Sequence, residues 1–289
     1  MSRTTSRGSA TVRQLCTAFK VSRQAFYAAA AAQPCPQPRV PAARSSVSAG
    51  VLETAIRRVV EEHRAWGVRK VWATLRRQEL RVSCKRVWAM MKHLGLVLPA
   101  AEHHDSPRFG HVATVESNRR WATDLTTVWT RQDGLVAIVP VVDCGDRFAL
   151  ECQVTKSQES SPVLLPVARA AEREFSDPSA VPAGLELRSD HGPQYTGRDC
   201  DALCELWRLE HTFAPVGRPT GNAVVERFIL TLKLELIWTR DWESLAELRD
   251  EVARWLVQYN QQRPHQALGW KTPAEQRALN LGDRLAIAA

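Results

Sequence analysis

The spacing of apolar positions changes along the chain and divides it into regions of different expected structure. In the first part, apolar residues recur every three or four positions, the spacing of one face of a helix. Ser22 and Ser83 stand where N-caps are expected, and Gly95 stands where a helix should end. The pattern therefore predicts a short helical pair within 11–31, followed by three helices over 51–66, 69–79 and 83–95.

Beyond residue 113 the pattern becomes that of a sheet. Three β-rich runs closed by short turns are typical of antiparallel hairpins, and they cover 119–130, 135–145 and 147–156. Helices and short apolar strands then alternate, with strands expected at 185–190 and 211–215 and helices at 160–175, 197–210, 222–238 and 244–260. Antiparallel strands followed by alternating helices and strands predict a mixed-sheet α/β fold.

Segments rich in Pro, Ser and small polar residues separate these regions, because such residues do not sustain a helix. They predict six parts: a short helical N-terminal segment (1–33), a linker (34–50), a helix-turn-helix-like DNA-binding segment (51–98), a second linker (99–113), a catalytic core with C-terminal helices (114–280) and a tail (281–289).

The distribution of charge gives the first part of the chain a candidate partner. Of 39 Lys and Arg, 19 lie in residues 1–110 against 6 Asp and Glu, whereas residues 111–289 hold the other 20 against 25 acidic residues. A basic part joined to a mildly acidic one fits a nucleic-acid grip attached to a carboxylate-bearing body, although Arg-rich solvated helix faces explain the charge equally well. In the helix-turn-helix interpretation, the residues that face DNA are Lys85, Arg86, Lys92 and His93.

Membrane and disulfide chemistry are not indicated. No stretch approaches the roughly 18 to 20 uninterrupted apolar residues of a spanning helix, and the polar N-terminus lacks the apolar core of a secretory signal, so we expect a soluble intracellular protein. The seven cysteines form no CxxC pair and are expected to be reduced. Cys200 and Cys204 can share one helix face, which favours packing over a metal site, since a structural zinc ion needs four ligands.

Three acidic residues carry the candidate chemistry. Asp124 lies within the first expected strand, Asp190 ends another, and Glu226 lies on an amphipathic helix. On that helix Lys233 is seven residues further on, within about 20° and about 10 Å of Glu226, and Asn222 is one turn earlier. Carboxylates that converge from distant segments suit a two-metal phosphoryl-transfer site. The same residues also fit N-caps, turn residues and surface charges.

The motifs around these acids decide between the two interpretations. WATDLTTVW, VVDCGDR, SDHGPQYT, GRPTGNAVVERFILTLKLE and YNQQRPHQALGWKTPAE, in this order, resemble the transposases of bacterial insertion sequences. They resemble in particular the second-reading-frame (OrfB-type) protein of the insertion-sequence family numbered three, within the retroviral-integrase-like superfamily. The resemblance runs from about Val51 to Ala274, and IRRVVEEHRAWGVRKVWATLRRQ resembles the helix-turn-helix that precedes the family's core. Gly221 departs from the Asp of many relatives before the Asn-Ala pair, but Gly also occurs there.

The resemblance implies a complete mechanism and setting. The fold would be a ribonuclease-H-like five-stranded mixed sheet with flanking helices. The enzyme would be a DDE-type polynucleotidyl transferase in which Asp124, Asp190 and Glu226 bind two Mg²⁺ ions, Mn²⁺ substituting, for donor-end cleavage and strand transfer. Lys233 and Asn222 would contact DNA. The protein would act in the bacterial cytoplasm at the nucleoid, on element ends and target DNA, as a homo-oligomer, alone or fused by frameshifting to an upstream-frame product.

Two other functions remain open, a catalytically silent DNA-binding regulator derived from such an element and a nuclease that cleaves without strand transfer. Three nearby residues were weighed as additional ligands. Asp143 and Asp146 are expected to be turn residues, and His191, in a loop beside Asp190, is expected to be solvated more often than to approach the metal or the scissile phosphate.

Overall fold

The computed structural model describes residues 12–25, 47–99, 114–214 and 222–282. The chain divides into two units, residues 1–46 and residues 47–289. In the first unit, helix α1 spans Val12–Ala18, and the Ser22 hydroxyl accepts a hydrogen bond from the Ala25 backbone N–H at 3.0 Å, as expected of an N-cap. Most of the second helix predicted within 11–31 lies outside the described residues.

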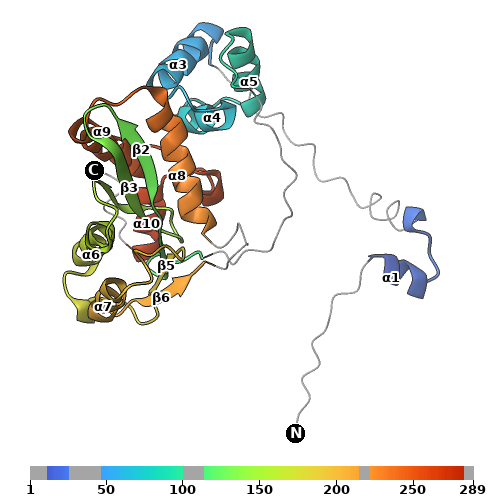
Figure 1. Cartoon of the computed structure of the whole chain (residues 1–289). Coiled ribbons are helices and arrows are strands. Elements are labelled where there is room, and N and C mark those ends of the chain that lie inside the picture. The colour runs from blue at the N-terminus through green and yellow to red at the C-terminus, as the bar shows by residue number, and fades with distance from the viewer. Residues whose placement is uncertain (1–11, 26–46, 100–113, 215–221, 283–289) are drawn as a thin grey trace. The chain divides into compact units, whose positions relative to one another are not determined.

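The second unit begins with three short helices, α3 (Ala49–Glu62), α4 (Val68–Arg77) and α5 (Cys84–His93), which lie close together in Figure 1. Ser48 and Ser83 cap α3 and α5 by accepting backbone N–H bonds. Gly95, just beyond α5, has φ +69°, the left-handed conformation that ends many helices. The three helices share one apolar core, which contains Leu52, Ile56, Val71, Leu75, Val87 and Met91. The predicted helical segment is therefore confirmed.

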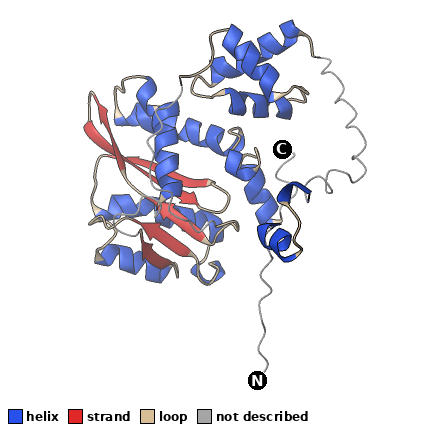
Figure 2. Cartoon of the chain, turned by 90° about the vertical axis from the view of Figure 1, so that its right-hand side faces the viewer, coloured by secondary structure: helices blue, strands red, loops and turns tan. Residues whose placement is uncertain are grey.

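The remainder is a mixed sheet covered by helices on both faces (Figure 2). Its strands are β1 (Arg120–Thr123), β2 (Thr126–Thr130), β3 (Gly134–Asp143), β4 (Ala149–Thr155), β5 (Glu186–Ser189) and β6 (Glu210–Phe213). The long strand β3 pairs antiparallel with β4 along one edge and with β2 and then β1 along the other. Strands β5 and β6 extend the sheet beyond β1 in parallel.

The strand count corrects the expectation of five strands. Residues 119–130 were expected to form one strand, but they form two, β1 and β2, separated by Asp124 and Leu125. Because β1 and β2 occupy successive halves of the same edge of β3, the sheet has six strands in five positions. Asp124 consequently lies at the break between strands rather than within one. The mixed-sheet α/β class itself is confirmed.

Alternate residues of the strands face two separate cores. Helices α8 (Ala223–Glu235) and α9 (Leu245–Gln261) contribute to the core on one face, together with Ile138 and Val142. Helices α6 (Ser160–Phe175) and α7 (Arg198–Leu206) contribute to the core on the other, which contains Val139, Val141 and Leu187. Because both faces are covered, the long strand β3 reads as a continuous apolar run rather than as an alternating one.

The C-terminal helix α10 (Pro273–Leu281) is fixed to the turn between β3 and β4 by a buried ion network. Arg277 donates to Asp143 at 3.2 Å and to Asp146 at 2.8 Å, and it also pairs with Glu174. Asp143 and Asp146 accept backbone N–H bonds within the turn, from Gly145 and Phe148. Asp146 is thus a turn residue, as expected, whereas Asp143 is the last residue of β3, and both have an additional role in holding α10. None of the described helices is long and apolar enough to cross a membrane.

Candidate active site

Asp124 and Asp190 lie side by side at one edge of the sheet. Each directly follows a strand, Asp124 after β1 and Asp190 after β5. The two strands are parallel neighbours in which Ala122 lies opposite Arg188, so the residues two positions further along emerge at the same level. Ligand-binding residues of α/β sheets gather at such strand ends. The pairing therefore explains why two carboxylates separated by 65 positions belong to one site.

Helix α8 brings the third carboxylate to this edge. Val225, Ile229 and Leu232 are buried against the sheet, whereas Glu226, in the first turn, is exposed. Glu226 and Lys233 border the same cavity of about 280 Å³ as Asp124. Because Glu226 and Lys233 are two helical turns apart, they lie on the same side of α8 and line one cavity, as their spacing in the sequence predicts.

Electrostatics show that the three acids share one environment. Burial, together with the negative charges of Asp190 and Glu226, raises the pKa of Asp124 to about 6. The Leu125 N–H, which donates to the Asp124 carboxylate at 2.8 Å, and the charge of Lys233 oppose this rise in the pKa. Burial also raises the pKa of Glu226. A site that disfavours its own negative charge is one that a cation would stabilise.

The residue before Asp124 is held from two sides. The buried Asn222 side chain donates to the Thr123 carbonyl oxygen at 3.1 Å, and the Thr123 hydroxyl lies 3.3 Å from the hydroxyl of buried Tyr195. Asn222 was expected to contact DNA. Its side chain is instead only 6% exposed and ties the start of α8 to the end of β1, so it positions Asp124 from behind.

The loop after β5 fixes Asp190 in a tight turn. One oxygen of the Asp190 carboxylate accepts the Gly192 N–H at 2.9 Å, and a Cβ at Gly192 would stand only 2.9 Å from that oxygen. His191 is exposed, and its ring stacks on Phe213 with a centroid separation of 4.6 Å. The structure therefore places His191 beside Asp190, with its ring against the end of β6.

The donor set fits a hard divalent cation. Three carboxylates supply only oxygen ligands, which suit Mg²⁺ or Mn²⁺ and not the thiophilic metals. Among the described residues the buried Oδ1 of Asn222 has no hydrogen-bond partner, although the Nδ2 of the same side chain bonds to the Thr123 carbonyl oxygen at this strand end. The residues present are therefore those that such a metal would require.

Known proteins that resemble the chain share both of its folded parts. Residues 115–219 and 208–273 match two family models described as integrase core domain, and residues 49–103 match one described as HTH-like domain. The transposase InsD for insertion element IS2A/D/F/H/I/K of Escherichia coli is 32% identical over 239 residues, which cover 78% of each protein. The chain belongs to the insertion-element transposase family. It is thus a polynucleotidyl transferase of the transposase–integrase type.

Further similar proteins include InsD of element IS2-9 of Escherichia coli K12, again 32% identical, over 78% of this chain and 77% of the relative. Among solved structures, the catalytic core of HTLV-2 integrase in complex with magnesium is 16% identical, with a TM-score of 0.43, over 57% of this chain and 99% of that one. A chain of the simian T-cell lymphotropic virus intasome is 17% identical, with a TM-score of 0.48, over 77% and 74%. These identities are too low to carry information on activity.

The helix-turn-helix-like part of the transposase presents a basic face on α5. Lys85 and Lys92 are exposed, and Trp88 between them is 48% exposed, with the Lys92 ammonium 5.3 Å from its ring centroid. Arg86 differs from its neighbours, because its guanidinium donates to the Val47 carbonyl at 2.6 Å and so supports the start of α3. The structure thus leaves Lys85 and Lys92 on an open surface and uses Arg86 at least partly for packing.

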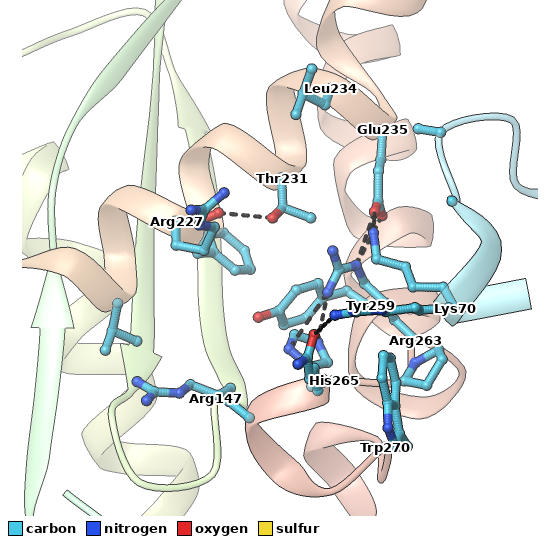
Figure 3. Close-up of a pocket in the computed structure, with 18 of the residues that line it drawn as sticks. Lys70, Arg147, Arg227, Thr231, Leu234, Glu235, Tyr259, Arg263, His265 and Trp270 are labelled. Carbon is cyan, nitrogen blue, oxygen red and sulfur yellow. Dashed lines mark hydrogen bonds and ion pairs between the residues drawn. The ribbon is translucent and has the colours of Figure 1, made fainter. Parts of the chain in front are cut away.

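A second cavity, of about 790 Å³, lies on another side of α8 and was missed by sequence reasoning (Figure 3). Glu235 binds Lys70 at 3.0 Å and Arg263 at 2.9 Å. Three further cations line the cavity without an acidic partner in the described parts of the chain: the exposed Arg69 and Arg227, and Arg147, whose buried Nη1 has no hydrogen-bond partner there.

The potential in this basic cavity is positive. Burial, together with the positive charges of Arg263, Lys70 and Arg147, lowers the pKa of His265 to about 2. Arg227 directly follows Glu226 in the sequence. Of these two adjacent residues of α8, Glu226 lines the cavity that also contains Asp124, and Arg227 lines the basic cavity. The sequence signal that was available is the basic residue after Glu226.

Proposed function

We propose that the chain is a DDE-type transposase that cleaves the donor ends of an insertion sequence and transfers its strands to target DNA, with Asp124, Asp190 and Glu226 as metal-binding catalytic residues. The observation that carries this proposal is the electrostatic coupling of the three carboxylates at the ends of β1 and β5 and the start of α8. Membership of the insertion-element transposase family supports it.

We propose further that these carboxylates hold two Mg²⁺ ions, for which Mn²⁺ substitutes. When bound, such ions activate an attacking oxygen and stabilise the leaving oxygen of a phosphodiester. Asp124 and Asp190 would provide ligand oxygens from neighbouring strand ends, and Glu226 would provide them from the helix. Lys233, on the same cavity, would place its ammonium against a DNA phosphate. Asn222 and Tyr195 would keep the peptide that carries Asp124 in position.

We assign the grip on DNA to the helix-turn-helix-like segment, residues 51–98, and catalysis to residues 114–280. Lys85 and Lys92 on α5 would contact DNA phosphates, Trp88 lying between them. The unpaired cations Arg227 and Arg147 of the basic cavity would extend this grip next to the catalytic carboxylates. Contacts of this kind give affinity that depends strongly on salt and little on sequence. Assembly as a homo-oligomer on DNA, and action with an upstream-frame product, belong to the same proposal.

The decisive experiment compares Asp190→Asn with the wild-type protein on a DNA that carries element ends. The variant should lose Mg²⁺-dependent cleavage and joining by at least a hundredfold while its affinity for the DNA changes less than twofold. Asp241→Asn is the matched control, because Asp241 carries an equal charge on a side chain that is 87% exposed. Full cleavage by Asp190→Asn would contradict the assignment of the site.

The products formed by the wild-type protein separate the alternatives. Joined DNA is the expected result for a transposase. Nicked DNA without joining would instead identify a nuclease of the same fold. Binding to element ends with no metal-dependent cleavage would identify a regulator and overturn the proposal.

A further inference from the structure

A second group of metal-ligating side chains lies behind the catalytic edge of the sheet. Cys200 and Cys204 are four residues apart on α7 and therefore share one face of that helix, which is buried. His211 lies on β6, against which this face packs. The two sulfur atoms and one ring nitrogen of His211 all lie within 4.8 Å of one another. Among the described residues, these are the three potential metal ligands that lie this close together.

The geometry of the cluster matches a tetrahedral metal. Zinc lies about 2.3 Å from a thiolate sulfur and about 2.0–2.1 Å from an imidazole nitrogen, so two such ligands at the tetrahedral angle are about 3.6 Å apart. The Cys200 sulfur is 3.7 Å from the His211 Nδ1. An ion would thus fit between these atoms with little movement of α7 or β6.

The protonation of His211 is set in the way that a ligand requires. The Ser189 hydroxyl donates its hydrogen to the Asp190 carbonyl at 2.9 Å, so its oxygen can act only as an acceptor toward the His211 Nε2, also at 2.9 Å. Nε2 therefore carries the proton, and the Nδ1 lone pair points toward the cysteines. Metal-binding histidines are usually oriented by such a bond from the other ring nitrogen.

The environment also favours the thiolate form of one cysteine. The hydrogen bond between the two thiols is the largest cause that lowers the pKa of Cys200, and the same bond raises the pKa of Cys204. The thiolate is the form that binds metal. Two sulfur ligands and one imidazole suit Zn²⁺ and not Mg²⁺, so the cluster differs in chemistry from the carboxylates of the active site.

We propose that Cys200, Cys204 and His211 form a Zn²⁺ site, with water as the fourth ligand on the side of the partly exposed His211. The ion would connect α7 to β6 and, through Ser189, to the strand end that carries Asp190. Such an ion is structural and takes no part in phosphoryl transfer. Its presence does not depend on the proposed function, because it is measured without DNA and without cleavage.

The test measures the metal content of the full chain after dialysis against Zn²⁺ and removal of excess metal. Wild-type protein should retain one zinc ion per chain, and Cys200→Ser, Cys204→Ser and His211→Gln should each lose it. Cys84→Ser is the matched control and should retain the ion, because Cys84 lies on α5, outside the cluster. Ser189→Ala should weaken zinc affinity by about 10- to 100-fold, the usual effect of removing the partner that orients a ligand.

A second measurement uses the wild-type protein alone, in case a variant fails to fold. Replacing zinc by Co²⁺ should give the visible absorption of a tetrahedral site together with a thiolate-to-cobalt charge-transfer band. Zinc should also protect two of the seven thiols from modification until a chelator is added. Wild-type protein without retained zinc and without these bands would overturn the proposal. Zinc retained by a Cys200→Ser/Cys204→Ser double variant would overturn it as well.

Discussion

Removing the charge of Asp124 should stabilise the metal-free protein, even though Asp124 is proposed to be essential for activity. Burial raises the pKa of this carboxyl from 3.8 to about 6, so near neutral pH the folded state holds a charge that its surroundings disfavour. Asp124→Asn keeps the shape, and its side-chain oxygen can still accept the Leu125 N–H. The variant removes only the charge.

The magnitude follows from proton linkage. A pKa that rises on folding means that the folded state binds protons more tightly, so stability falls as pH rises from the unfolded pKa to the folded one. The rise of the pKa from 3.8 to about 6 means that the Asp124 charge lowers the free energy of unfolding by at most about 3 kcal/mol. This loss of stability is present in full above pH 6 and absent below about pH 4. For a core of this size, removing this loss in Asp124→Asn should raise the melting temperature by about 6–12 °C at most.

The assay is thermal or denaturant unfolding of both proteins between pH 4 and pH 8 in the presence of a chelator. Asp250→Asn is the control, because Asp250 is exposed on α9 and should give no pH-dependent difference. Added Mg²⁺ should then stabilise the wild-type protein and not Asp124→Asn, because only the wild type retains all three carboxylates. An Asn variant that is no more stable than wild type at pH 7.5, or whose advantage persists unchanged at pH 4, would refute the reasoning.

Two further predictions concern the ion network under α10 and the proposed DNA-binding face of α5. Arg277→Met should cost about 3–5 kcal/mol in unfolding free energy, because it leaves Asp143 and Asp146 buried without their cation. Arg173→Met removes the ion pair of Arg173 with Glu151, in which the arginine side chain is 59% exposed, and should cost less than about 1 kcal/mol. Equal losses of unfolding free energy for the two variants in urea would contradict this account. Lys85→Gln and Lys92→Gln should each reduce the slope of log affinity against log salt by about 0.9, whereas Lys156→Gln should leave the slope unchanged in the same titration.

The sequence predicts most of the elements because their patterns are local. The capping residue Ser83, the apolar stripe of α8 and the long run of β3 each depend on residues within one element. The break between β1 and β2 is different. Residues 119–130 read as one β-rich strand, but β3 pairs with its two halves separately, and β1 must also pair with β5. That division depends on pairing with distant segments, so periodicity cannot reveal it.

The candidate site shows the same limit at single residues. The position of Asp190 follows from a strand end and that of Glu226 from helical phase, both of which the sequence displays, whereas Asp124 was expected within a strand and lies at the break between β1 and β2. Asn222 was placed on the DNA because it lies one turn before Glu226, yet the adjoining Thr123 carbonyl takes up its side chain. Helical phase states which way a residue points along its own helix, but not what lies opposite.

The cysteines on α7 show the limit from the other side. Their spacing indicates a shared helix face. The third side chain that makes them a candidate metal site, His211, lies on the strand that follows the helix. The signal was present as one His at the start of an expected strand. Only the packing of α7 against β6 makes it a third ligand, because no spacing rule connects a helix with the strand that follows it.

In the candidate active site, the buried carboxylate charges reduce the stability of the metal-free fold. Asp124 and Glu226 are held where burial disfavours their charge, and Asn222 and Tyr195 prevent the strand end from moving away to relieve it. Such a site can persist only because the apolar cores on both faces of the sheet supply the stability that the carboxylates remove. A divalent cation would reverse the sign of this contribution, since these two disfavoured charges would be among its ligands. The same residues that weaken the metal-free fold are therefore those that would bind the metal most strongly.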